Sequence, residues 1–225
     1  LPEKNRMLTD WFGQEPLDLE EVLAWAAPLA EAIAPRVRDT VQVLHRANSQ
    51  QERILFEGAQ GTFLDVDHGS YPYVTSSTTL ASGACAGSGV GPGSIGHVIG
   101  IAKAYTTRVG SGPFPTELEG ELEEKLRTLG GEFGATTGRP RRCGWFDVPL
   151  MKRAIQLNGV THLVLTKLDI LSGMPTLKVA TEYTGSEDFP SDAQTMQRVT
   201  PALTEMPGWN QDLQECTVYD DLPAA

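Results

Sequence analysis

The apolar segment His162–Thr166 limits the possible folds of this chain more than any other feature. It lies between a helical pattern at residues 149–157, stopped by Asn158-Gly159, and the polar turn Lys167-Leu168-Asp169. A short apolar run bounded by turn residues is typical of a strand buried on both faces, which occurs in parallel sheets covered by helices. We therefore expect an α/β fold.

The rest of the chain alternates in the same way. Helices are expected at residues 18–33, capped by Asp18, at about 36–46, from near Ser94 and at 117–129. Pro28 and Pro35 predict a break or kink between the first two helices. Strands are expected at residues 53–57, 106–109, 176–183 and 199–206. Together these segments predict one domain over residues 1–225, with a mainly parallel central sheet, flanking helices and long glycine-rich binding loops.

Composition and charge exclude several classes of protein. The 225 residues include 18 basic and 29 acidic side chains, for a formal charge of −11, which disfavours non-specific binding to nucleic acid or to an anionic membrane. No apolar run reaches the roughly 18 residues of a membrane-spanning helix. The three cysteines form neither a zinc pattern nor a disulfide framework, so we expect a reducing, cytoplasmic location.

Two long loops, at about residues 58–93 and 133–145, are rich in glycine and small polar residues, as binding loops are. In the first, Gln60 could offer one donor and one acceptor to a neutral heterocycle.

Asp67 and His68 are adjacent on an extended chain and point apart, so we predict no metal or acid–base pair there. The Gly87-Ser88-Gly89-Val90-Gly91 run lacks a preceding apolar strand, which argues against a dinucleotide turn.

Two charged clusters suggest ligand chemistry. Asp169, just after the predicted strand, could accept two hydrogen bonds from the N1 and N2 edge of guanine, while the stem of Lys167 lies over the base. Arg139, Arg141 and Arg142 concentrate positive charge in an acidic chain, and guanidinium groups suit carboxylate or phosphate. The ordinary alternatives are a solvated turn and a solvated basic loop. These residues alone indicate a purine-nucleotide and small-anion binding domain, without fixing a reaction.

A set of longer motifs in order resembles the adenylosuccinate synthetase family. The motifs are Leu55-Phe56-Glu57-Gly58-Ala59-Gln60-Gly61-Thr62, Asp67-His68-Gly69, Tyr71-Pro72-Tyr73-Val74-Thr75-Ser76-Ser77, Ala104-Tyr105-Thr106-Thr107-Arg108-Val109-Gly110, Gly112-Pro113-Phe114-Pro115-Thr116-Glu117, residues 132–138 and Thr166-Lys167-Leu168-Asp169. The resemblance runs from about residue 36 to the end of the chain, and more loosely before it.

This resemblance implies a GTP-dependent ligase that condenses IMP with L-aspartate, with Mg²⁺ as cofactor and a homodimer as assembly. The family pattern implies the following residue roles. Gln60, Thr75 and Arg139 contact IMP; Ala135, Thr136, Thr137, Gly138, Arg139, Pro140 and Arg141 form the aspartate-binding loop; Arg141, Lys167, Leu168 and Asp169 bind GTP. Pro140 stands where many relatives have another arginine, which removes one positive charge but neither of the two arginines assigned here.

Other parts of the family pattern have no counterpart in residues 1–225. These are the Gly-Asp-Glu-Gly-Lys-Gly loop, whose aspartate acts as base and binds Mg²⁺, the histidine that acts as acid, and the Gly-Pro segment that closes over guanine. We therefore expect a central and C-terminal portion of the enzyme, inactive in isolation, with no catalytic or metal residue of its own. The alternatives are a non-catalytic guanine-nucleotide binding module and an assembly partner of a full-length subunit.

Overall fold

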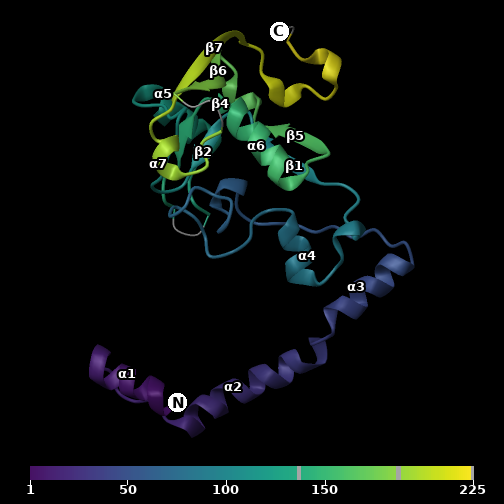
Figure 1. The fold of residues 1–225 in the computed structure, drawn as a ribbon, viewed down its shortest axis with the longest axis vertical. Coiled ribbons are helices and arrows are strands. Elements are labelled where there is room, and N and C mark those ends of the chain that lie inside the picture. Colours follow the sequence, from purple (N-terminus) through teal and green to yellow (C-terminus); the bar gives the residue numbers. More distant parts are fainter. Residues whose placement is uncertain (136–137, 186–188, 224–225) are drawn as a thin grey trace. The chain divides into compact units, whose positions relative to one another are not determined.

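The computed structural model describes residues 1–135, 138–185 and 189–223. These residues divide into two compact units, Leu1–Arg53 and Ile54–Ala225, each of which is coloured along the sequence in Figure 1. None of the described helices is both long and apolar enough to cross a membrane.

The regular structure of the first unit is helical. It consists of α1 (Pro2–Phe12), α2 (Leu19–Ile33), the 3₁₀ turn Ala34–Arg36 and α3 (Thr40–Ser49). The predicted cap is confirmed, because the Asp18 carboxylate accepts hydrogen bonds from two backbone amides of the first turn of α2. Pro28 does not break the helix, since it lies inside α2, whereas the predicted break is confirmed at the 3₁₀ turn that contains Pro35. The third helix begins at Thr40 rather than near residue 36, because Asp39 caps it.

The helices of this first unit bury none of their residues. Trp11 and Trp25 remain 74% and 73% exposed, and Leu23 is 56% exposed. The helices therefore follow from local signals, namely caps and apolar periodicity, rather than from a core formed within this unit.

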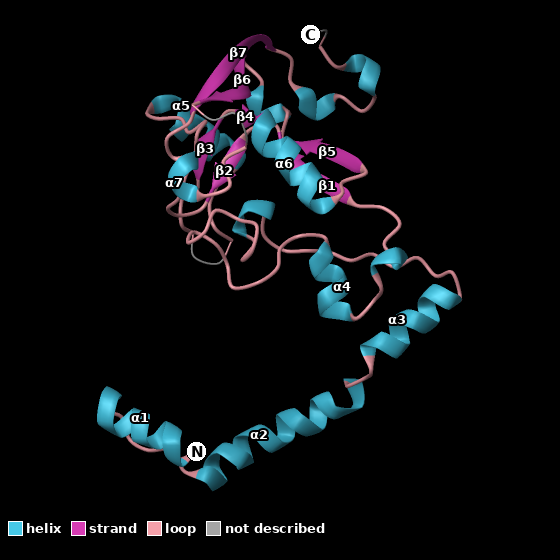
Figure 2. Ribbon diagram, in the orientation of Figure 1, coloured by secondary structure: helices cyan, strands magenta, loops and turns pink. Residues whose placement is uncertain are grey.

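The second unit contains three small sheets (Figure 2). β1 (Ile99–Lys103) pairs in parallel with β5 (His162–Thr166), and β2 (Thr106–Arg108) pairs antiparallel with β3 (Arg142–Gly144). β4 (Phe146–Asp147) pairs in parallel with β6 (Met174–Thr184), which pairs antiparallel with β7 (Thr200–Trp209). The α/β class is confirmed; among the described strands, two pairs are parallel and two are antiparallel.

The helices of the second unit are short. They are α4 (Ser82–Ser88), α5 (Glu121–Gly130), α6 (Val148–Asn158) and α7 (Ala193–Met196), with 3₁₀ turns at Thr62–Leu64, Pro92–Ser94, Asp169–Leu171, Leu213–Glu215 and Tyr219–Asp221. The predicted end of α6 is confirmed, because Gly159 takes the left-handed conformation that closes a helix. α5 begins at Glu121 rather than near residue 117, since Glu117 forms a β-bridge with Gly144.

Three further predictions were wrong, all for reasons of pairing. The helix expected from Ser94 is the strand β1, whose partner β5 comes much later in the chain. Residues 53–57 form no strand, and Leu55 is 85% exposed. β5 is a strand but is not buried, because a two-stranded sheet has too few neighbours to cover both faces; Val164 is 45% exposed.

The core of the second unit is formed by side chains from α5, β3, β6 and the segments next to them. Its buried side chains are Ala104, Tyr105, Leu126, Cys143, Trp145, Leu171, Met174 and Leu177. Tyr105 and Leu126 are almost fully buried. Ala104 and Tyr105 are the first two residues after β1, so the core reaches the end of that strand, where the polar groups described next are found.

Candidate functional site

Strand pairing places two distant lysines at the same edge of a sheet. In the parallel pair β1–β5, Lys103 is in register with Thr166, and Lys167 is the next residue. The carboxyl ends of parallel strands are where α/β folds bind ligands. The structure therefore brings the predicted guanine-binding turn beside Lys103, a residue to which the sequence assigned no role.

A single carboxylate, Glu132, joins these two lysines to the predicted aspartate loop. Its Oε2 accepts hydrogen bonds from Lys103 Nζ at 2.6 Å and Arg141 Nη1 at 2.8 Å. Its Oε1 accepts from the Tyr105 hydroxyl at 2.6 Å and Lys167 Nζ at 3.1 Å. We call Glu132, Lys103, Tyr105, Arg141 and Lys167 the Glu132 cluster.

Burial differs sharply within the Glu132 cluster. The Glu132 side chain is fully buried, whereas those of Lys103, Arg141 and Lys167 are 26%, 29% and 34% exposed. Three cations share one carboxylate, so the cluster carries two formal positive charges in excess, in a chain of net charge −11. A buried carboxylate beneath partly exposed cations is an arrangement suited to binding an anion.

The titration of the cluster follows from these contacts. Burial alone would raise the pKa of Glu132, but hydrogen bonds from Lys103, Tyr105 and Arg141 outweigh it and hold this pKa at about 2. Burial lowers the pKa of Lys103, and the nearby charges of Arg141 and Lys167 lower it further, against the opposing effect of Glu132. Burial and the carboxylate both raise the pKa of Tyr105, which therefore stays a neutral donor.

The predicted GTP-binding residues lie directly after β5. Lys167 has a left-handed backbone, with φ of 61°, and its Nζ also donates to the Gly130 carbonyl. Its ammonium is thus held by protein groups. Leu168 packs against the core, and Asp169 begins a 3₁₀ turn. Within the described residues, the Asp169 carboxylate accepts no side-chain or backbone hydrogen bond, so its oxygens are available to a ligand.

The predicted aspartate loop forms a turn after α5. The Gly134 amide donates to the Arg139 carbonyl, Phe133 bridges to Pro140, and the Arg141 amide donates to the Glu132 carbonyl. Ala135 and Gly138 lie within this turn. Thr136 and Thr137 were also assigned to it but lie outside the described residues.

The predicted IMP-binding residues Gln60 and Thr75 lie together. Gln60 Nε2 donates to Thr75 Oγ1 at 3.5 Å, and Ser77 donates to Gln60 Oε1, also at 3.5 Å. Gln60 has a left-handed backbone, with φ of 67°. The third assigned residue, Arg139, places its guanidinium beside Gly110, 3.6 Å from the position that a β-carbon would take there.

A second buried carboxylate, Asp65, fixes the loop that carries Thr75. Asp65 Oδ1 accepts from the amides of Asp67 and His68, each at 3.0 Å, and its Oδ2 accepts from the Thr79 amide at 2.8 Å. Burial opposes ionisation, yet these amides hold the pKa of Asp65 below its usual value. Asp67 and His68 therefore donate backbone hydrogen bonds to Asp65.

One turn, residues 110–112, links the two loops. Arg108 donates to the Ser70 hydroxyl at 2.9 Å and to the Tyr73 carbonyl at 3.1 Å, which ties the Asp65 loop to β2. Arg142 donates to the carbonyls of Gly110 and Gly112 at 3.1 and 2.9 Å. The Arg139 guanidinium lies beside the same Gly110, and Arg108 also donates to the Ser111 carbonyl at 3.0 Å, so this turn contacts the aspartate loop directly and the Asp65 loop through Arg108.

Sequence reasoning missed Glu132, Lys103, Tyr105 and Asp65 as site residues. Each lies within or beside a motif, but a single carboxylate or lysine in a motif gives no signal of its partners. The partners of these side chains are identified only by their proximity in the folded structure.

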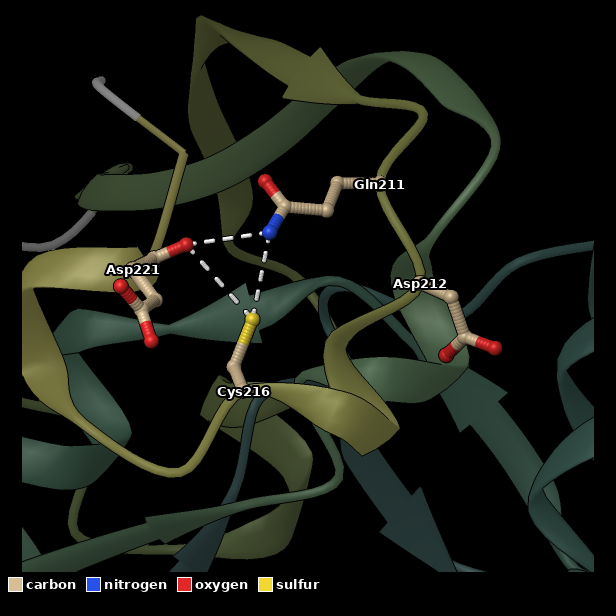
Figure 3. Close-up of a pocket in the computed structure, with 4 residues that line it drawn as sticks. All are labelled: Gln211, Asp212, Cys216 and Asp221. Carbon is tan, nitrogen blue, oxygen red and sulfur yellow. Dashed lines mark hydrogen bonds between the residues drawn. The ribbon is translucent and has the colours of Figure 1, made fainter.

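The structure also has a surface pocket close to the C-terminus, lined by Gln211, Asp212, Cys216 and Asp221 (Figure 3). Gln211 Nε2 donates to the Asp221 carbonyl at 3.0 Å. None of the predicted site residues lines this pocket. Among the described residues, no group of three or more His, Cys, Asp or Glu side chains could hold a metal ion.

A family model of adenylosuccinate synthetase matches residues 1–225. The chain belongs to the adenylosuccinate synthetase family. The adenylosuccinate synthetase of Geotalea daltonii is 51% identical over 227 residues, covering 99% of this chain and 53% of that protein. The enzyme of Xanthomonas euvesicatoria is 50% identical over 225 residues, with 98% and 52% covered. The chain thus spans about half the length of the curated relatives it matches.

The fold matches this family as well. The structure of fully ligated adenylosuccinate synthetase from Plasmodium falciparum superposes with a TM-score of 0.89 at 32% identity, over 99% of this chain and 54% of that one. The fold expected from the resemblance to adenylosuccinate synthetase is therefore confirmed.

Proposed function

We propose that the protein carrying this chain is a ligase that condenses IMP with L-aspartate to adenylosuccinate, with release of GDP and phosphate, in AMP biosynthesis. The observation that carries the proposal is the meeting of the predicted aspartate loop and the predicted guanine turn at Glu132, in a chain of this family. No observation favours a non-catalytic guanine-nucleotide module or an assembly partner.

Asp169 is proposed to select guanine. Its carboxylate follows a strand end and accepts no hydrogen bond from the described residues, so it can accept from guanine N1–H and N2–H₂. Adenine presents no such pair of donors. Because the Lys167 ammonium is bound to Glu132 and Gly130, the stem of Lys167 and the side chain of Leu168 are left to contact the base.

Arg139 and Arg141 are proposed to bind the carboxylates of the substrate aspartate, with Arg141 also close to nucleotide oxygens. Guanidinium groups bind carboxylates through paired hydrogen bonds, which fixes the direction of the amine. The remaining loop residues, Ala135, Thr136, Thr137, Gly138 and Pro140, contribute backbone and hydroxyl groups. Pro140 itself has no amide hydrogen to donate.

Gln60 and Thr75 are proposed to contact IMP, with Arg139 reaching the same ligand. A side-chain amide offers both a donor and an acceptor, which matches the edge of a neutral purine. The contact between Gln60 and Thr75, and the fixed loop around Asp65, support this role.

The proposed reaction transfers the γ-phosphoryl group of GTP to the 6-oxygen of IMP, after which the aspartate amine displaces phosphate. A carbonyl oxygen leaves poorly until it is phosphorylated. The family resemblance implies Mg²⁺ with ligands outside residues 1–225, and among the described residues no group of three or more His, Cys, Asp or Glu side chains could hold it. We further propose a homodimer in the cytoplasm, and a single domain of which residues 1–225 are one part.

Two measurements test this function. The full-length protein is expected to form adenylosuccinate from IMP and aspartate only when GTP is present, with ATP unable to replace it. Calorimetry on the chain of residues 1–225, with GDP against ADP, is expected to show selective GDP binding if the turn of residues 166–169 forms the pocket. Formation of adenylosuccinate with ATP, but not GTP, would refute the guanine assignment.

A further inference from the structure

Glu132 contacts both predicted substrate loops at once. It accepts hydrogen bonds from Arg141, in the aspartate loop, and from Lys167, in the guanine turn. Its side chain is fully buried beneath these cations, so it does not face a ligand directly. Its influence on substrates must therefore pass through Arg141 and Lys167.

The position of Glu132 is tightly constrained. Its amide donates to the Arg127 carbonyl at 2.8 Å at the end of α5, and its carbonyl accepts from the Arg141 amide at 3.0 Å. A β-carbon on Gly130 would lie 2.2 Å from the Tyr105 hydroxyl and 3.2 Å from Glu132 Cγ. The carboxylate is thus fixed by backbone, by a buried tyrosine and by a close glycine.

The surrounding charges explain why such a carboxylate matters. Lys103, Arg141 and Lys167 repel one another, and each long side chain has many rotamers when it is not held. A shared carboxylate keeps all three in one arrangement before any ligand arrives. When the side chains are already ordered, binding loses less conformational entropy, so the affinity for the ligand is higher.

We propose that Glu132 is a positioning residue that holds Arg141 and Lys167 together, so that the binding of GTP and of aspartate depends on one carboxylate. This inference rests on the proposed function, and it adds a coupling between two substrate sites. In the proposed function the IMP contact Thr75 lies in a loop that a different carboxylate, Asp65, supports.

The test is Glu132→Gln in the full-length protein. The neutral amide keeps the shape of the side chain but removes the negative charge that Lys103, Arg141 and Lys167 share. We expect KM for GTP and KM for aspartate each to rise about 10-fold, the size typical of a lost charge-assisted contact. We expect KM for IMP to rise less than either, because two of its three assigned contacts, Gln60 and Thr75, are held outside the Glu132 cluster, whereas Arg139 lies in the aspartate loop.

Asp147→Asn is the matched control. Asp147 is a second buried carboxylate that accepts a tyrosine hydroxyl, from Tyr183 at 2.6 Å, and it also caps α6. It contacts no predicted substrate residue. This variant is expected to lower stability and leave the three KM values unchanged, which separates positioning from a general loss of structure.

Glu132→Asp keeps the negative charge but shortens the side chain by one methylene. This variant tests the positioning role of Glu132 if Glu132→Gln does not fold. It is expected to raise KM for GTP and for aspartate together, by about 3-fold to 10-fold. Unchanged KM values, a rise for one of these substrates alone, or an equal rise for IMP would overturn the proposal.

Measuring GDP affinity by calorimetry separates a failure of this inference from a failure of the proposed function. If the wild-type protein binds GDP but makes no adenylosuccinate, the proposed function fails, while weaker GDP binding by Glu132→Gln still supports the positioning role. Equal GDP affinity of wild type and variant refutes that role. A wild-type protein that does not bind GDP overturns both.

Discussion

Asp65 and Glu132 are both fully buried carboxylates, yet they are satisfied in opposite ways. Asp65 accepts hydrogen bonds from backbone amides within its own loop, whereas Glu132 accepts from three cations and a tyrosine. Amide donors fix the path of the chain. Cations bring charge that one carboxylate does not neutralise. The partners of a buried carboxylate therefore indicate whether it serves a loop shape or a charged site.

Asp169 completes the comparison as a carboxylate without a hydrogen-bond partner among the described residues. It lies one residue from Leu168, which packs against the core, so its backbone is anchored while its oxygens are not engaged. Asp65 thus supports a loop, Glu132 holds three cations, and Asp169 is a candidate contact to a ligand. Replacing each by its amide tests this division.

The largest effect on stability is expected for Glu132→Gln. Removing one partner of a buried ionic cluster costs about 3–5 kcal/mol, and partial exposure of the three cations places this case near the lower end. Because the folded pKa of Glu132 is about 2 against an ordinary value of 4.5, its contribution is present above about pH 4.5 and is lost as the pH falls towards 2. Urea unfolding of the full-length wild type and variant at pH 7 and pH 3 measures this.

The difference in unfolding free energy between wild type and Glu132→Gln is expected to shrink at pH 3. An equal difference at both pH values would show that the carboxylate charge does not contribute, and would remove the contrast with Asp65.

A smaller loss, about 1–3 kcal/mol, is expected for Asp65→Asn. The amide nitrogen cannot accept a hydrogen bond, so the Thr79 amide, or those of Asp67 and His68, loses its partner. KM for IMP is expected to rise while KM for GTP stays constant, the reverse of the Glu132→Gln pattern. Steady-state kinetics on the full-length variant measures both, and a rise confined to GTP would contradict the assignment of this loop.

Asp169→Asn is expected to leave stability unchanged, because this carboxylate makes no described hydrogen bond. It should weaken GTP binding by on the order of 1.5–3 kcal/mol, since an ionic acceptor for guanine N1–H and N2–H₂ is lost. Calorimetry with GDP, and with IDP, which lacks the N2 amino group, measures this. Unchanged GDP affinity would remove Asp169 from the guanine site.

Local sequence signals predicted the elements that are fixed locally. Asp18 caps α2, Gly159 ends α6, and the alternating pattern near residues 176–183 forms β6. Prediction failed at β1, expected as a helix, because a strand is stabilised by a partner that its own sequence does not reveal. The strand expected at residues 53–57 does not form, because no described segment pairs with these residues.

The sequence by itself determined the family, through long motifs in a fixed order, and the residues that belong to each predicted binding loop. Tertiary structure alone decided that Lys103, Arg141 and Lys167 share one carboxylate. The parallel register of β1 and β5 places two strand ends side by side, and the end of α5 brings Glu132 beneath them. Such an arrangement depends on contacts between residues far apart in the chain, and no local pattern of residue types records those contacts.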